Sequence, residues 1–170
     1  MKNLILIRHA KSNRENPTSD INRSISQRGI KDAILISNLV ENTLPQKYII
    51  WSSIAKRTVE TSYIFAQNLL YPIENINFKS ELYTFDEKEL FKQIAKCEDS
   101  CENIIIFGHN DAITNFVNKF GDKKINNVPT SGLVQIEFNT NSWKTISKGK
   151  TLQVLFPKEV REKNKNEYIH

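Results

Sequence analysis

Two of the three histidines in this chain of 170 residues directly follow apolar runs that are typical of buried strands. His9 comes after Leu4–Ile7 and Arg8, and His109 comes after a second such run. The neutral form of imidazole is populated near pH 7 and can attack phosphorus as a nucleophile. Chemistry that needs imidazole must therefore use His9, His109 or the C-terminal His170.

Two arginines accompany these histidines. Arg8 precedes His9, and Arg57 ends the polar segment 52–57 that follows the apolar run Tyr48–Trp51. A guanidinium group binds phosphate through paired N–H donors, and no acidic residue lies in the polar segments that carry these arginines and histidines. Taken singly, such residues usually belong to a surface or a core. Taken together, they favour a crevice that binds an anion.

The elements that must position these residues are short apolar runs that alternate with helical patterns. Five strands are predicted, at 4–7, 48–51, 76–78, 103–107 and 133–138, with an edge strand at 143–147 or 152–156. Four helices are predicted, at 26–40, 54–70, 87–96 and 112–120. The first and fourth strands are apolar on both faces, as parallel strands covered by helices are. The pattern predicts an α/β fold, a three-layer α/β/α sandwich with a mostly parallel central sheet.

The helix ends add to the site. Ser53 is predicted to cap the second helix, which puts Arg57 in its first turn, and Asn110 or Asp111 starts the helix after His109. Helix N-termini favour bound anions. The first helix is predicted to begin at a Ser26 cap and to bury a stripe of four residues: Ile30, Ala33, Ile34 and Ser37.

Ligands of open α/β sheets bind beyond the carboxyl ends of the strands. Because parallel strands bring those ends together, we expect Arg8, His9, Arg57 and His109 to converge on one crevice. The chain has no G-x-x-x-x-G-K loop and no G-x-G-x-x-G turn, which argues against a nucleotide kinase or a dinucleotide enzyme. It also has no cysteine within a phosphate loop, so a histidine nucleophile remains, with a phosphohistidine that water later hydrolyses.

Three motifs resemble those of the histidine phosphatase superfamily, also called phosphoglycerate mutase-like: Arg8-His9-Ala10, Ser52-Ser53 followed by Arg57 and Thr61, and Gly108-His109. Three segments are similar to its short bacterial branch, the SixA-type phosphohistidine phosphatases: Ile7–Ser12, Gly108–Asn110 and Asn127–Gly132. The likeness spans about residues 3 to 138. It implies His9 as the phosphorylated nucleophile in a phosphate pocket with no metal or other cofactor. The pocket residues it implies are Arg8, Arg57 and His109, and further substrate contacts are expected from Ser12 and Asn110.

The chain departs from the family pattern at three places. Ala10 replaces the commoner glycine, and Ile54 replaces a proline at the start of the second helix. The usual acid in Leu-x-Glu is absent, because the matching stretch is Leu82-Tyr83-Thr84. Three acids lie near without the same register: Glu81, Asp86 and Glu87. Glu81 is the candidate proton donor among them.

The predicted substrate follows from what is missing between the third and fourth strands, where only one short helix is expected. Longer relatives use insertions there to cap the site over small metabolites. An uncapped crevice admits a phosphorylated side chain, so we predict phosphohistidine of a protein, such as a phosphorelay domain, as the substrate. The alternatives are a phosphatase of a small phosphorylated metabolite and a non-catalytic phosphate- or phosphoprotein-binding module.

Composition sets further expectations. Lys and Arg number 24 against 19 Asp and Glu, a net charge of +5, but the lysines are scattered, so nucleic acid is not an expected partner. No signal-peptide pattern and no apolar stretch of roughly 18 residues occurs, which predicts a cytoplasmic protein without membrane contact. We expect one domain at 1–156 and a charged tail at 157–170. The oligomeric state stays open.

The two cysteines, Cys97 and Cys101, are four residues apart. A disulfide or half of a zinc site is conceivable, but the histidines are too dispersed to complete a metal quartet. Two reduced thiols are the favoured interpretation.

Overall fold

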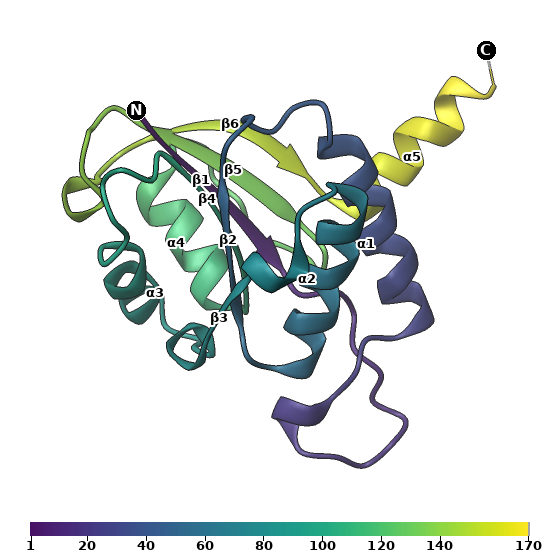
Figure 1. Ribbon diagram of the computed structural model, residues 1–170. Helices are drawn as coiled ribbons and strands as arrows, with labels where there is room; N and C mark the ends of the chain where they lie inside the picture. The colour runs from purple at the N-terminus through teal and green to yellow at the C-terminus, as the bar shows by residue number, and fades with distance from the viewer. Residues whose placement is uncertain (170) are drawn as a thin grey trace.

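Six strands form one mixed sheet in the order β3-β2-β4-β1-β5-β6 in the computed structural model, which describes residues 1–169 (Figure 1). Strands β3, β2, β4 and β1 pair in parallel, whereas β5 is antiparallel to both β1 and β6. The mostly parallel sheet predicted from the sequence is confirmed. The strand bounds are β1 Lys2–Arg8, β2 Ile49–Ser53, β3 Asn77–Lys79, β4 Asn103–Gly108, β5 Leu133–Phe138 and β6 Lys150–Leu155.

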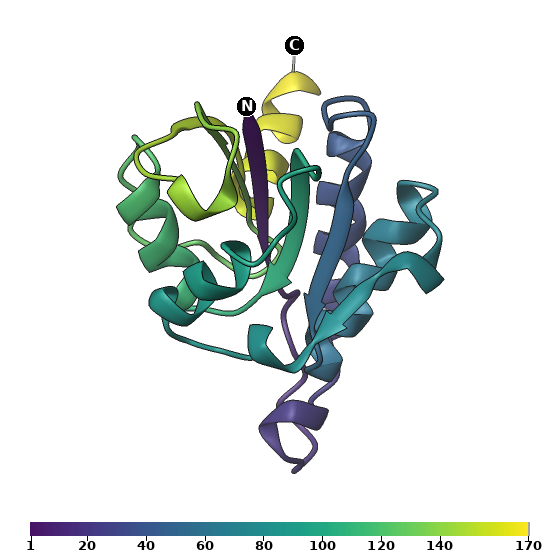
Figure 2. The same cartoon turned by 60° about the vertical axis from the view of Figure 1, so that its left-hand side comes forward.

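Helices cover both faces of the sheet, which makes the three predicted layers (Figure 2). One face carries α1 (Gln27–Val40), α2 (Lys56–Asn68) and α5 (Pro157–Glu167), and the other carries α3 (Glu87–Ile94) and α4 (Ala112–Phe120). The α/β/α architecture is therefore confirmed.

The alternation of side chains along β1 divides the core in two. Leu4 and Leu6 belong to the cluster under α3 and α4, whereas Ile5 and Ile7 belong to the cluster under α1 and α2. Successive residues of a strand point to opposite faces, so a run that is apolar throughout must be covered on both sides. This burial holds β1 in the middle of the sheet, and the chain emerges from it at Arg8.

Helix α1 begins at the predicted cap, where the Ser26 hydroxyl accepts a hydrogen bond from the Gly29 amide at 3.1 Å. The predicted buried stripe is wrong in part, because Ile30 and Ile34 are each 41% exposed. The helix is rotated so that its buried face consists of Gly29, Asp32, Ala33, Ile36, Ser37 and Val40. A Cβ at Gly29 would collide with the Lys11 carbonyl oxygen, so glycine permits α1 to lie against the chain that leaves β1.

The start of α2 differs from the prediction. Ser53 is the last residue of β2 and Ala55 occupies the cap position, so the predicted Ser53 cap is wrong. The Ser53 hydroxyl instead accepts from the Ala55 amide at 3.3 Å and lies 2.8 Å from His109 Nε2. Arg57 lies in the first turn of α2, as predicted.

The second of the two predicted edge strands is the correct one, because β6 covers 150–155. Residues Trp143–Thr145 form a 3-10 turn instead of a strand, and the fully buried Trp143 ring packs in the core. The indole Nε1 donates to the Cys101 carbonyl at 2.7 Å. The buried Trp143 side chain explains the apolar signal that suggested a strand there.

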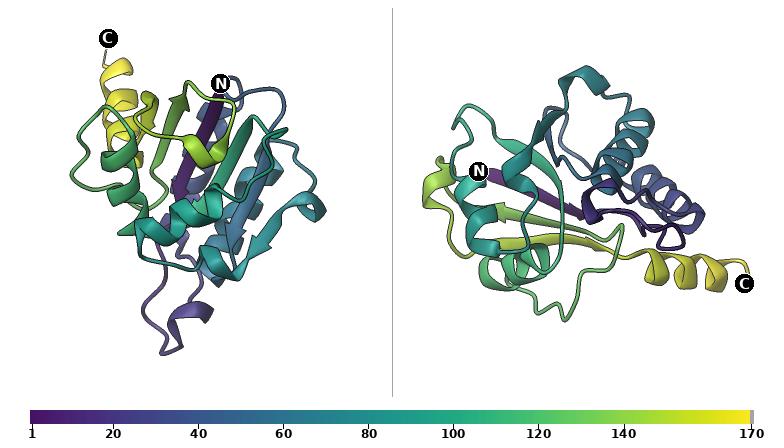
Figure 3. Two further views of the ribbon diagram at one scale, coloured as in Figure 1. Left: turned by 90° about the vertical axis from the view of Figure 1, so that its left-hand side faces the viewer. Right: turned by 90° about the horizontal axis from the view of Figure 1, so that it is seen from below.

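The charged tail forms α5, which packs on α1 through Val160 and projects beyond the sheet (Figure 3). His170 lies outside the described residues. Within residues 1–169, no helix has the length and apolar character needed to span a bilayer. Cys97 is buried in the core and Cys101 is half-buried, and both are free thiols.

Candidate active site

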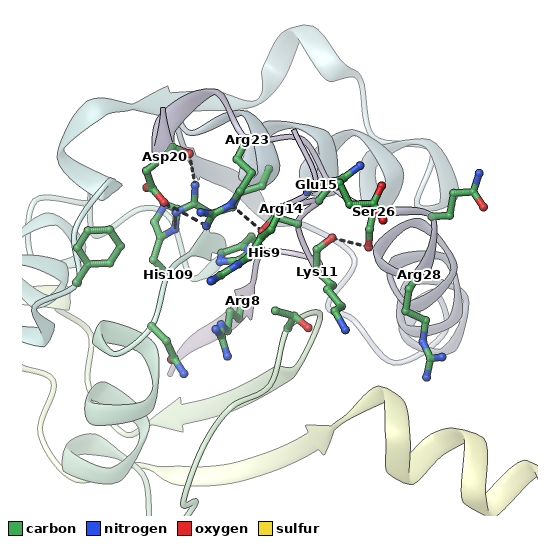
Figure 4. A pocket seen from close by; sticks show the side chains of 17 residues that line it. Arg8, His9, Lys11, Arg14, Glu15, Asp20, Arg23, Ser26, Arg28 and His109 are labelled. Atoms are coloured by element: carbon green, nitrogen blue, oxygen red, sulfur yellow. Dashed lines mark hydrogen bonds and ion pairs between the residues drawn. The ribbon is translucent and has the colours of Figure 1, made fainter. Parts of the chain in front are cut away.

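The carboxyl ends of three parallel strands meet at one edge of the sheet, as the sequence predicts. Arg8 at the end of β1 pairs with Gly108 at the end of β4, and Ser52 of β2 pairs with Phe107. A cleft of about 1150 Å³ opens at this edge (Figure 4). All four residues predicted to do the chemistry line it: Arg8, His9, Arg57 and His109.

The backbone selects the tautomer of His9. The Nδ1 atom lies 2.8 Å from the Ala10 carbonyl oxygen, which can only accept a hydrogen bond. Nδ1 therefore carries the proton and donates it to Ala10, while Nε2 keeps its lone pair. His9 lines the cleft through a ring whose one unprotonated nitrogen is the group a nucleophile requires.

Burial keeps His9 neutral. The side chain is 7% exposed, and this burial lowers its pKa from 6.5 to about 3. The hydrogen bond to Ala10 opposes the shift, and the charges of Arg57 and Arg8 increase it. A neutral imidazole at pH 7 is a nucleophile, whereas imidazolium is not.

His109 is held by α2 and by the end of β2. Its Nδ1 lies 3.3 Å from Nη2 of Arg57, which can only donate, so Nδ1 accepts and Nε2 carries the proton. Nε2 then donates to the Ser53 hydroxyl at 2.8 Å. Burial, together with the nearby His9 and Arg57, lowers the pKa of His109 to about 2. The two imidazole rings are 5.3 Å apart, and both are neutral.

Arg57 is 2% exposed and pairs with an acid, Asp20. Asp20 lies outside the polar segments that follow β1, β2 and β4 and carry the predicted arginines and histidines. Its Nη2 donates to the Asp20 carboxylate at 3.0 Å, and its Nη1 donates to the Asp20 backbone carbonyl at 2.7 Å. Asp20 lies on a 3-10 turn, Asp20–Asn22, in the loop that follows β1 and extends beyond the edge of the sheet (Figure 3). The Asp20 carboxylate in the cleft therefore comes from a loop and not from the polar segments at the strand ends.

Two guanidinium groups still have buried donors without partners. Arg8 donates from Nη1 to the Val128 carbonyl at 3.0 Å, but its Nε has no hydrogen-bond partner. The Nε of Arg57 is also buried without a partner. A buried donor without a partner costs free energy, so each of these guanidinium groups has an N–H that no protein acceptor uses.

Asp20 connects the loop that follows β1 to the segment that carries Tyr83. It accepts a hydrogen bond from the Tyr83 hydroxyl and forms an ion pair with Arg23 at 3.1 Å. The Tyr83 hydrogen bond lowers the pKa of Asp20, and Arg57 adds to the effect. Asp20 is thus a carboxylate at pH 7. The rings of Tyr83 and Phe85 lie 5.2 Å and 5.6 Å from the His109 ring, so they cover it from one side.

The two predicted substrate contacts line the cleft with their polar groups engaged. The Ser12 hydroxyl accepts from Arg23 Nε at 2.8 Å. The Asn110 amide donates to the Val128 carbonyl at 3.1 Å and to Asn127 at 2.9 Å. Asn110 therefore holds the loop 127–132 beside Arg8.

The same loop is fastened to the end of β1. The Ser131 amide donates to the Arg8 carbonyl at 3.1 Å, and the Arg8 amide donates to the Gly132 carbonyl at 3.1 Å. Ser131 has φ of 59°, a left-handed turn residue that redirects the chain into β5. Because β5 is antiparallel to β1, this turn necessarily lies at the edge where the cleft opens.

Glu81 is exposed and does not line the cleft. Of the other two acids near the expected position, Asp86 caps α3 by accepting from the Lys88 amide. Among the described residues, the carboxylates that line the cleft are Asp20 and Glu15. No group of three or more His, Cys, Asp or Glu residues within 1–169 is arranged to hold a metal ion.

Sequence reasoning missed Asp20, Arg23, Tyr83 and Phe85. These residues lie in irregular segments whose conformation no periodic pattern predicts. One usable signal was the Asp20-x-x-Arg23 spacing, because residues three apart in a helical turn can form an ion pair.

Solved phosphatase structures share this architecture at low sequence identity. A protein histidine phosphatase SixA complexed with tungstate matches with a TM-score of 0.78 and 14% identity, over 93% of this chain and 99% of that one. A protein provisionally assigned as phosphohistidine phosphatase SixA from Agrobacterium tumefaciens matches with a TM-score of 0.72 and 19% identity, over 91% and 97% of the two chains. The alpha-ribazole phosphatase from Shigella flexneri matches with a TM-score of 0.65 and 14% identity, over 90% and 95%.

These structures confirm the phosphoglycerate mutase-like fold, the fold of the histidine phosphatase superfamily. No protein-family profile matches the sequence. No curated protein matches it either.

Proposed function

We propose that this chain is a metal-independent phosphatase that transfers the phosphoryl group of its substrate to His9 Nε2 and then to water. The observation that carries this function is the His9 ring itself. It is buried and neutral, and the Ala10 carbonyl leaves its Nε2 lone pair free in a cleft that the guanidinium groups of Arg8 and Arg57 also line. Nε2 forms the new bond to phosphorus as the bond to the leaving group breaks, and a water molecule later releases the phosphate.

The favoured substrate is phosphohistidine on a protein. Expelling an alkoxide requires a proton donor, and a positioned acid contributes ~10²–10⁴-fold. Asp20 cannot supply that proton, because Arg57, Arg23 and Tyr83 hold it as a carboxylate. Phosphohistidine needs no such acid: once its ring carries a proton, the P–N bond breaks and neutral imidazole departs. The SixA proteins that share this fold are named as phosphatases of histidine or phosphohistidine, which supports the same substrate class.

The shape of the cleft supports a protein substrate. The chain between β3 and β4 contains the turn Ser80–Leu82 and the eight residues of α3, and α3 packs with α4 over the sheet face. Of this segment, Tyr83 and Phe85 cover His109 from one side, whereas α3 lies over the sheet face and not over the cleft. A phosphorylated side chain on a protein surface can therefore enter, whereas small metabolites are usually enclosed by their sites.

The experiment that tests the covalent step is rapid quench of native protein with phosphoramidate or a phosphohistidine peptide in the presence of EDTA. Acid-labile, alkali-stable phosphate on His9 is expected, and His9→Ala abolishes both label and turnover. Substantial turnover by His9→Ala contradicts the mechanism. Phosphate binding without turnover or label identifies a binding module instead.

The substrate order provides a second test. We expect phosphohistidine to react fastest, an aryl phosphate next, and phosphoserine or a sugar phosphate slowest. Glu81→Gln should leave phosphohistidine hydrolysis within a fewfold of native, because Glu81 lies outside the cleft. If a sugar phosphate is the best substrate and Glu81→Gln disables it, Glu81 is the acid and the substrate is a metabolite.

A further inference from the structure

The positive charge of the chain is concentrated at the cleft. Six of its 24 Lys and Arg residues and two of its 19 Asp and Glu residues line the cleft, so the remaining 18 and 17 nearly cancel. A scattered surplus would give no direction to an approaching molecule. A surplus gathered in one concave surface raises the local concentration of an anionic partner.

Three of these cations are not needed to bind a phosphoryl group. Lys11, Arg14 and Arg28 are exposed and line the cleft, and we call them the basic rim. Lys11 and Arg28 lie on the α1 side of His9, and His109 lies on the other side (Figure 4). The phosphoryl group itself has the guanidinium groups of Arg8 and Arg57, which line the cleft beside His9.

The rim is placed by α1. The Lys11 carbonyl accepts from the Ser26 amide at 2.7 Å and from the Ser26 hydroxyl at 3.0 Å, which ties the rim segment to the first turn of the helix. Arg28 lies in that turn, and its Nε is 3.4 Å from Asp32. Lys11 and Arg28 are therefore held together by the start of α1, and Arg14 lies in the loop that follows Lys11.

The rim charges are available to a partner. Lys11 and Arg14 form no ion pair with any residue in 1–169, and Asp32 is shared between Arg28 and Arg161. Besides Asp20, the one acid that lines the cleft within residues 1–169 is the exposed Glu15. Exposed, unpaired cations on long side chains are the groups that guide and orient acidic protein surfaces.

We propose that the basic rim docks acidic side chains beside the phosphohistidine of a phosphorylated protein. This inference rests on the proposed function and adds the chemistry of the partner surface to it. The phosphoryl group enters between Arg8 and Arg57, and carboxylates of the same protein reach Lys11, Arg14 and Arg28. A protein fits better than a small polyanion, since the three rim residues line a wide cleft of about 1150 Å³.

The experiment uses three peptides of equal length with one phosphohistidine, flanked by aspartates, serines or lysines. For native protein at low ionic strength, we expect kcat/KM for the aspartate peptide to exceed that for the serine peptide by about tenfold. The lysine peptide should be the poorest. Salt should reduce the preference, because screening acts on exposed charges.

The rim variant is Lys11→Gln/Arg14→Gln/Arg28→Gln. It should lose the preference for the aspartate peptide while hydrolysing phosphoramidate within twofold of native. The matched control removes the same charge from α5, as Lys158→Gln/Lys163→Gln/Lys165→Gln, and should keep the preference. If the triple variant unfolds, the double variant Lys11→Gln/Arg14→Gln preserves the Arg28–Asp32 pair and should lose most of the preference.

The outcomes separate the two proposals. Equal kcat/KM for the aspartate and serine peptides in native protein overturns rim docking, as does a full preference in the rim variants. In both cases turnover itself continues. No turnover of any peptide or of phosphoramidate, with no label on His9, overturns the proposed phosphatase function instead.

Discussion

The floor of the cleft and its covering side are built in opposite ways. The floor consists of Arg8, His9, Arg57 and His109, which lie at strand ends or in a first helical turn and are anchored to the sheet. The covering side consists of Asp20, Tyr83 and Phe85, which lie in irregular segments. Phe85 is 53% exposed, whereas Arg57 is 2% exposed. The floor is thus fixed by the sheet and α2, whereas the covering side depends on contacts between loops.

The largest effect is expected at the floor, from Arg57→Lys. An ammonium group cannot reproduce the guanidinium contacts to Asp20, to His109 and to phosphate at once. We expect Arg57→Lys to lower kcat/KM on the order of 10²-fold, nearly as much as Arg57→Ala. Steady-state kinetics with phosphoramidate measures it. If lysine restores most of kcat/KM, Arg57 supplies charge alone and the floor is less specific than its geometry indicates.

On the covering side, Asp20→Asn should have the next largest effect. Asp20 orients Arg57, and an amide would present N–H groups to donors that need an acceptor. We expect kcat to fall about tenfold, as for other carboxylates that position a site residue. Inorganic phosphate should inhibit at the same or a lower concentration, because Asp20→Asn removes a negative charge that partly neutralises Arg57.

Glu81→Gln is the matched control for this change, since it removes an exposed carboxylate outside the cleft. It should leave kcat within a fewfold of native. An unchanged kcat in Asp20→Asn would show that the floor holds Arg57 without help from the covering side.

Phe85→Leu should have a smaller effect that depends on the substrate. The Phe85 ring lines the cleft 5.6 Å from His109, where an aromatic leaving group can pack against it. Aromatic pairs contribute about 0.5–1.5 kcal/mol beyond burial, so KM for a phosphohistidine peptide should rise severalfold. Phosphoramidate has no ring and serves as the control, with an unchanged KM. Equal changes for both substrates would mean that Phe85 only supports the fold.

The remaining prediction concerns stability instead of kinetics and belongs to the floor. Both His9 and His109 have native pKa values far below the 6.5 of the unfolded chain. Between pH 6.5 and about 3, the unfolded chain therefore binds protons that the native protein excludes. This part of the stability is present above pH 6.5 and is lost as the pH falls, by about 1 kcal/mol per pH unit for each histidine.

Urea unfolding at pH 7 and pH 5 measures this dependence. His109→Gln should lose less stability over that interval than native protein, and His9→Gln should behave in the same way. Equal losses in native protein and both variants would show that the floor histidines are charged in the native state.

The sequence by itself determined the sheet and the floor. The all-apolar runs of β1 and β4 can be satisfied only by burial on both faces, and parallel strands then place Arg8, His9 and His109 at one edge. The position of Arg57 was also predictable, because the helix that follows β2 places it in its first turn, at the same edge. These inferences depend on periodicity and chain direction, which are local properties of the sequence.

Only the tertiary structure decided what surrounds that floor. The Asp20 contact with Arg57 spans 37 residues and joins a loop to α2, and the Tyr83 contact with Asp20 spans 63 residues and joins two loops. The cap at Ala55 and the rotation of α1 also depend on neighbours, since the Ser53 hydroxyl bonds to His109 and Gly29 packs on Lys11. Such choices are made by the packing of irregular segments against one another, and no local propensity encodes them.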